Sequence, residues 1–137
     1  MAFATDFKTG RRFKTKLAVT YEKIVMSHLL GKSFIVDEKN EYIKARFYLY
    51  SKNLITSKNA ISKTSGDWDG RIKILQDYIS KGLSFNDALI CSAEVYKLTS
   101  KADRTIVVLE TRPLIELLML GDSYENNERE ILRHCQN

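Results

Sequence analysis

Proline and glycine are scarce in this chain, which has one proline, Pro113, and six glycines in 137 residues. Sandwiches and barrels built only of strands need many turns, and turns rely on these two residues. We therefore expect a mostly α protein, a compact helical bundle. A small β-hairpin or short strands stay open around 33–50 or 104–110, because Tyr42–Tyr50 and Thr105–Leu109 are also rich in strand-forming residues.

The length and the apolar content fit one domain, residues 1–137, with its own hydrophobic core. Within it we distinguish a flexible basic arm at 1–12, a basic half at 13–64 and a helical, mildly acidic half at 65–137. No apolar run reaches the ~20 residues that span a bilayer, and the N-terminus has no apolar signal-peptide core. We expect a cytoplasmic protein without a membrane partner.

Helix boundary signals recur along the sequence. Apolar residues at steps of three and four predict a helix at Thr15–Leu30, which Gly31 would end. Asp69 is expected to cap a helix that runs to Lys81, and Ser84 a further one from Phe85 to about Leu98. Pro113 suits the first turn of a helix through Leu120, closed by Gly121.

Charge is divided unevenly between the two halves. Residues 1–64 hold 13 lysines and arginines against 5 acidic residues, a net charge of +8, and residues 65–137 carry −3. Such asymmetry points to a polyanionic partner, because lysine and arginine neutralise phosphates. The first half also has nine of the aromatic residues, which could stack on unpaired bases, although helical spacing favours a place in the core for them.

Ten cations are the candidate nucleic-acid contacts. Five belong to the densely basic segment Lys8–Lys16, three to a lysine-containing stretch at 51–63, and two to the segment 101–110. They are Lys8, Arg11, Arg12, Lys14, Lys16, Lys52, Lys58, Lys63, Lys101 and Arg104.

The stretch Tyr78-Ile-Ser-Lys-Gly-Leu-Ser-Phe-Asn-Asp-Ala-Leu-Ile, followed by Thr105, Ile106, Leu109 and Pro113, resembles a helix-turn-helix. The similarity covers residues 71–113 and is nearest in character to phage small terminase subunits. It implies that residues 101–110 form a recognition helix in the major groove of DNA. An ordinary corner between two helices would use the same glycine, so the pattern leaves that alternative open.

The expected function is that of a non-catalytic nucleic-acid-binding protein of a regulatory or packaging type, encoded by a phage or a mobile element, with DNA as the partner and no cofactor. The alternative is a small adaptor that docks on a larger protein, such as a polymerase, through the apolar segment Leu114–Leu120. The single enzymatic alternative is a metal-dependent nuclease, with Asp67 or Asp69 and Glu110 as metal ligands and Arg112 beside them. We expect neither catalysis nor a bound metal.

Overall fold

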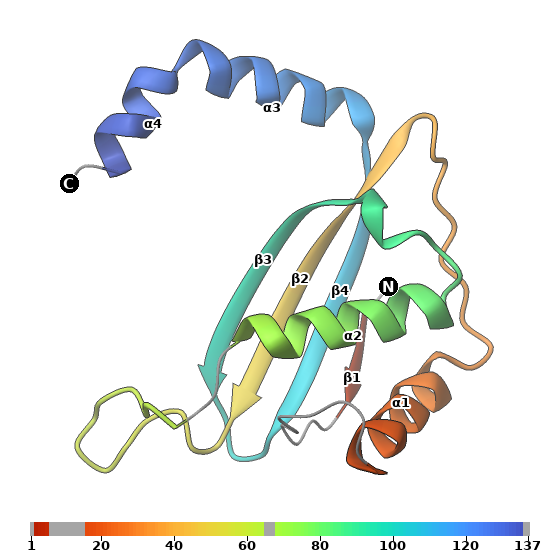
Figure 1. Ribbon diagram of the computed structural model, residues 1–137, viewed down its shortest axis with the longest axis vertical. Helices are drawn as coiled ribbons and strands as arrows, with labels where there is room; N and C mark the ends of the chain where they lie inside the picture. The colour runs from red at the N-terminus through yellow and green to blue at the C-terminus, as the bar shows by residue number, and fades with distance from the viewer. Residues whose placement is uncertain (1, 6–15, 65–67, 136–137) are drawn as a thin grey trace.

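The computed structural model describes residues 2–5, 16–64 and 68–135. They form both strands and helices (Figure 1). The elements are β1 (Ala2–Thr5), α1 (Lys16–Leu29), β2 (Glu41–Ser51), α2 (Trp68–Gly82), the 3-10 turn η1 (Asp87–Leu89), β3 (Ile90–Thr99), β4 (Arg104–Pro113), α3 (Leu114–Asn126) and α4 (Glu128–Cys135). The expectation of a mostly α bundle is wrong, because the fold is mixed α/β and is organised around a sheet.

The sheet has four strands in the order β1-β4-β2-β3. The β2 and β3 strands are parallel, whereas β4 is antiparallel to both β2 and β1. Phe47 is the partner of Val95 on one side and of Val107 on the other, so β2 is paired along both edges. The strands that the sequence left open at 42–50 and 104–110 are thus the two central strands of the sheet.

Side chains of β2 alternate between two environments. Ile43, Ala45, Phe47 and Leu49 are buried, whereas Lys44, Arg46, Tyr48 and Tyr50 are only half-buried. Successive residues of a strand point to opposite faces of a sheet, so the buried set marks the core face. The other set marks a second face, which we call the open sheet face.

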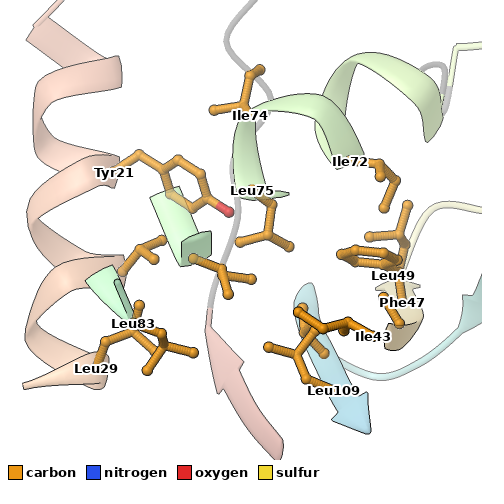
Figure 2. Close-up of a cluster of buried hydrophobic side chains, with 14 residues drawn as sticks. Tyr21, Leu29, Ile43, Phe47, Leu49, Ile72, Ile74, Leu75, Leu83 and Leu109 are labelled. Carbon is orange, nitrogen blue, oxygen red and sulfur yellow. The ribbon is translucent and has the colours of Figure 1, made fainter. Parts of the chain in front are cut away.

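Both α1 and α2 cover the core face (Figures 1 and 2). The two helices and the two central strands share one hydrophobic cluster, formed by Tyr21, Val25, Leu29, Ile43, Ala45, Phe47, Leu49, Ile72, Ile74, Leu75, Ile79, Leu83, Val107 and Leu109. The helices expected at Thr15–Leu30 and from Asp69 to Lys81 are confirmed within a residue or two.

The helix expected from Phe85 to Leu98 is absent. Ser84 has a φ of 58°, a left-handed backbone conformation that ends α2 and is unlike that of a helix N-cap. Asn86 is the residue that caps, and its side chain accepts a hydrogen bond from the Ala88 N–H at 2.9 Å. It starts only the short turn η1, after which the chain enters β3.

The segment 71–113 therefore holds one helix followed by two strands. Residues 101–110 form a turn and most of β4, so Lys101 and Arg104 do not lie on a recognition helix. The half at 65–137, which was expected to be helical, contains two strands besides its helices.

A helix does start directly after Pro113, as expected, but it does not stop at Gly121. It continues to Asn126, and α4 follows. Within the described ranges, no helix combines the length and the apolar character that crossing a membrane requires.

Candidate nucleic-acid interface

The first five candidate cations belong to the N-terminal segment. Lys8, Arg11, Arg12 and Lys14 lie outside the described residues, and Lys16 is the first residue of α1. The remaining five are all in the described part of the chain, and the structure decides how they are arranged.

Lys52, Lys101 and Arg104 come from separate segments that meet at one end of the sheet. The backbone N–H of Lys52 donates to Oδ1 of Asp103 at 2.9 Å, and the N–H of Ser100 donates to the Ser51 carbonyl at 3.2 Å. These two bonds tie the end of β2 to the turn between β3 and β4. Segments 51 residues apart in the sequence are thereby joined, and three cations are brought to the same end of the sheet.

Lys58 and Lys63 lie on the loop that follows β2. Ile55 and Ile61 pair as an isolated bridge, and Thr56 N–H donates to the Ala60 carbonyl at 2.8 Å, so the loop is a narrow hairpin. It projects from the same end of the sheet (Figure 1). Both lysines are exposed. We call the five cations Lys52, Lys58, Lys63, Lys101 and Arg104 the basic end.

One aromatic side chain lies at the basic end. The Arg104 guanidinium carbon lies 4.9 Å from the ring centroid of Tyr50, a cation–π geometry. Trp68, the first residue of α2, is 51% exposed. The sequence placed the aromatics mainly in the core and did not single out Trp68. The alternation along 42–50 was the available signal for Tyr50, since it puts that ring on the face opposite Phe47.

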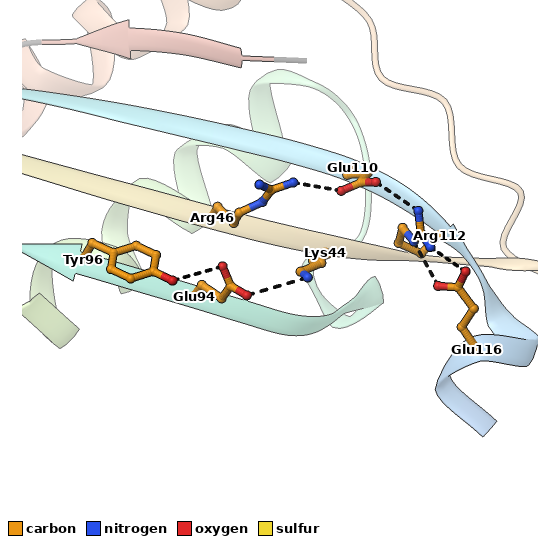
Figure 3. A network of polar contacts seen from close by, with 7 residues as sticks. All are labelled: Lys44, Arg46, Glu94, Tyr96, Glu110, Arg112 and Glu116. Atoms are coloured by element: carbon orange, nitrogen blue, oxygen red, sulfur yellow. Dashed lines mark hydrogen bonds and ion pairs between the residues drawn. The ribbon is translucent and has the colours of Figure 1, made fainter. Parts of the chain in front are cut away.

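The open sheet face carries a polar network at its other end (Figure 3). Glu110 accepts hydrogen bonds from Arg46 Nη2 at 3.1 Å and from Arg112 Nη1 at 3.1 Å. Arg112 Nε also donates to Glu116 in the first turn of α3, at 2.9 Å. Hydrogen bonding from Arg112, then from Arg46, lowers the pKa of Glu110.

A second group of the same network lies on β2 and β3. Lys44 Nζ is 3.6 Å from Glu94 Oε1, and the Tyr96 hydroxyl donates to Glu94 Oε2 at 3.3 Å. The negative charge of Glu94 raises the pKa of Tyr96. Tyr96 in turn stacks on Tyr48, with ring centroids 5.6 Å apart and planes 12° from parallel. Sequence reasoning missed these residues, because their proximity depends on the parallel pairing of β2 with β3.

The carboxylates of the nuclease alternative are not brought together. Glu110 is held by two arginines on the open sheet face, whereas Asp69 lies in the first turn of α2, which packs on the core face. Asp67 is outside the described residues. Arg112 contacts carboxylates of its own chain.

The basic end offers exposed cations and the ring of Tyr50, a set suited to phosphates and to bases. The polar network is different, because most of its charges are already paired within the chain. We therefore take the basic end as the candidate interface. No protein-family model matches the chain, and no curated protein matches its sequence.

Proposed function

We propose that the protein is a nucleic-acid-binding protein that uses the basic end, together with the cations of residues 8–16, to bind the phosphate backbone. The observation that carries the proposal is the convergence at one end of the sheet of cations from three places: the end of β2, the loop after it, and the β3–β4 turn. Scattered cations could each be solvated, whereas clustered cations together attract a polyanion and neutralise several of its phosphates.

The geometry favours contact with phosphates over reading of base edges. The five cations stand on a strand end, a turn and a loop, and none lies on a helix that could enter a groove. Phosphate contacts position a protein on nucleic acid but carry no sequence information. We therefore expect binding of many sequences with similar affinity, and single strands to gain from stacking on Trp68.

Fluorescence anisotropy with labelled duplex and single-stranded oligonucleotides, repeated over a range of salt concentrations, tests the proposal. Each phosphate contact contributes a log–log slope of about −0.9 on duplex DNA. The double variant Lys101→Ala/Arg104→Ala should flatten the slope by about 2 units and weaken all sequences alike.

The matched control is Lys32→Ala/Lys39→Ala. These exposed lysines precede β2, away from the basic end, and their replacement removes the same charge. A slope that is equal in the two double variants would mean that only net charge matters, and the proposed interface would be rejected. Arg11→Ala/Arg12→Ala tests the N-terminal segment separately, with an expected change of about 2 units.

A further inference from the structure

The helix α3 exposes apolar side chains in nearly every direction. Its exposed residues include Ile115 at 60%, Leu118 at 57% and Met119 at 65%, together with Leu120 and Tyr124. None of its residues is buried. It contacts mainly β4 and α4, its neighbours along the chain, and projects away from the sheet (Figure 1). Such a surface is typical of a segment that is covered by another chain.

The helix cannot cover the open sheet face of its own chain. It starts at Leu114, directly after the last residue of β4, with no connecting loop. The Leu114 N–H donates to the Asn40 carbonyl at 2.7 Å, and Arg112 binds Glu116, so both strand end and first turn are fixed. A chain that doubles back over its own sheet needs several connecting residues.

The open sheet face lacks a covering helix in the described part of the chain, since α1 and α2 both lie on the core face. The register places the stacked pair Tyr48 and Tyr96 on it, beside Ile106, Val108 and Leu98. Tyr96 is 44% exposed. This centre is aromatic and aliphatic, and it is flanked by charges.

The two surfaces are complementary in charge. The α3 helix has three acidic residues, Glu116, Asp122 and Glu125, and no lysine or arginine. Arg112 and Glu116 pair within the chain, which leaves Asp122 and Glu125 on the helix. The open sheet face then has the cations Lys44, Arg46 and Arg104 against Glu94 and Glu110, an excess of one positive charge. Opposite charges on facing surfaces orient an interface and favour one partner over others.

We propose that α3 is a dimerisation arm, which packs on the open sheet face of a second copy of this chain while the arm of that copy packs on the first. Each copy carries both the arm and the open sheet face on which an arm packs. When each of two copies places its arm on the other, the two contacts form a dimer with two-fold symmetry. A helix of 13 residues is about 20 Å long, and a strand of 10 residues spans about 33 Å, so the sheet can accommodate the arm.

The proposal does not depend on nucleic-acid binding and is tested without nucleic acid. Light scattering coupled to size-exclusion chromatography of the full chain should give twice the monomer mass of 15.8 kDa. The variant Leu118→Glu/Met119→Glu should halve that mass with an unchanged circular dichroism spectrum, since both residues are exposed in the monomer. The control Ile35→Glu, at a residue 86% exposed in the segment before β2, should remain a dimer.

A second pair of measurements identifies the surface on which the arm packs. Tyr96→Glu should also give a monomer, because it puts a buried charge beneath the acidic arm. With both free cysteines, Cys91 and Cys135, replaced by serine, Met119→Cys protein mixed with Tyr96→Cys protein should form an intermolecular disulfide under oxidation.

Three outcomes would overturn the proposal. The wild type could be monomeric at all concentrations, which would leave α3 for a foreign partner. The arm variant could stay dimeric. Alternatively, Met119→Cys could cross-link only to itself while Tyr96→Glu remains a dimer, which would mean that two arms pair with each other and leave the open sheet face uncovered.

Discussion

Arg104 lies over the ring of Tyr50, with its guanidinium carbon 4.9 Å from the ring centroid. The two residues face each other across the β2–β4 pair, where Tyr50 is the register partner of Arg104. The contact fixes an otherwise flexible cation at the border between the open sheet face and the basic end. It therefore gives Arg104 two separable roles, one in stability and one in binding.

We predict that Arg104→Lys and Arg104→Ala differ in a specific way. Both lose the contact of the guanidinium with the Tyr50 ring and should lower the free energy of unfolding by about 0.5–1 kcal/mol. Only the alanine variant removes the charge, so only it should flatten the salt dependence of nucleic-acid binding, by about 0.9 units. Urea denaturation and anisotropy titrations measure the two effects. If lysine changes the slope as much as alanine, Arg104 binds nucleic acid by more than charge.

The alternation along β2 predicts losses of stability of different size at neighbouring residues. Phe47 is 1% exposed, so Phe47→Ala should lower the free energy of unfolding by about 3–5 kcal/mol. Tyr48 stacks on Tyr96 on the other face, and Tyr48→Ala should cost about 0.5–1.5 kcal/mol. Both are compared by urea denaturation in the Leu118→Glu/Met119→Glu background, so that self-association does not contribute. Equal losses would contradict the assignment of the two faces.

The sequence predicted the parts of the fold that depend on local signals. The amphipathic periods of α1 and α2 identified both helices, and Pro113 marked the start of α3. Local signals failed at β3, where Ser84 and Asp87 imitate a helix start and the apolar residues of Ile90–Thr99 alternate only weakly. Pairing with β2, more than forty residues earlier in the chain, decides that this segment is a strand, and propensity does not report such pairing.

The candidate site could be predicted in part for a similar reason. Lys52 was selected from its basic stretch, and Lys101 and Arg104 from the helix-turn-helix-like segment. Nothing local indicated that the three would meet. Their convergence follows from the hydrogen bonds that join Ser51 and Lys52 to the β3–β4 turn. The same long-range pairing creates the Arg46–Glu110–Arg112 network, which no sequence pattern contained.

The lowered pKa of Glu110 predicts that the free energy of unfolding depends on pH in the acidic range. Arg112, then Arg46, holds this pKa below its ordinary value of 4.5 by hydrogen bonding. The pKa of Glu110 is lower in the folded than in the unfolded protein. The stability that ionised Glu110 contributes is therefore complete when the pH is above the ordinary pKa, and it is lost as the pH falls through the folded pKa. Carboxyl carbon chemical shifts should show Glu110 titrating below 4.5 in the wild type, and closer to 4.5 in Arg112→Ala. The control Lys32→Ala should leave that titration unchanged; an unchanged titration in Arg112→Ala would assign the shift to another cause.

The last prediction concerns the contact between α1 and α2, where Gly82 approaches Leu29. A Cβ atom on Gly82 would lie 2.6 Å from Leu29 Cδ1 and 3.0 Å from Met26 Sδ. Leu29 is 2% exposed and has little room to move, so Gly82→Ala should lower the free energy of unfolding by about 1–3 kcal/mol through overpacking. The sequence indicated Gly82 only as a helix end, whereas the structure gives it a second role, that of admitting α1.

Gly70→Ala is the matched control in the same helix. Nothing lies within 4 Å of the added Cβ, so this variant should raise the stability by up to about 1 kcal/mol, since alanine is the better helix former. A double-mutant cycle with Leu29→Ala then separates packing from propensity. The combined cost of Gly82→Ala and Leu29→Ala should be smaller than the sum of the single costs, because the cavity left at residue 29 accepts the new methyl group. Additive costs, or a stable Gly82→Ala variant, would show that the two helices are free to separate at this contact.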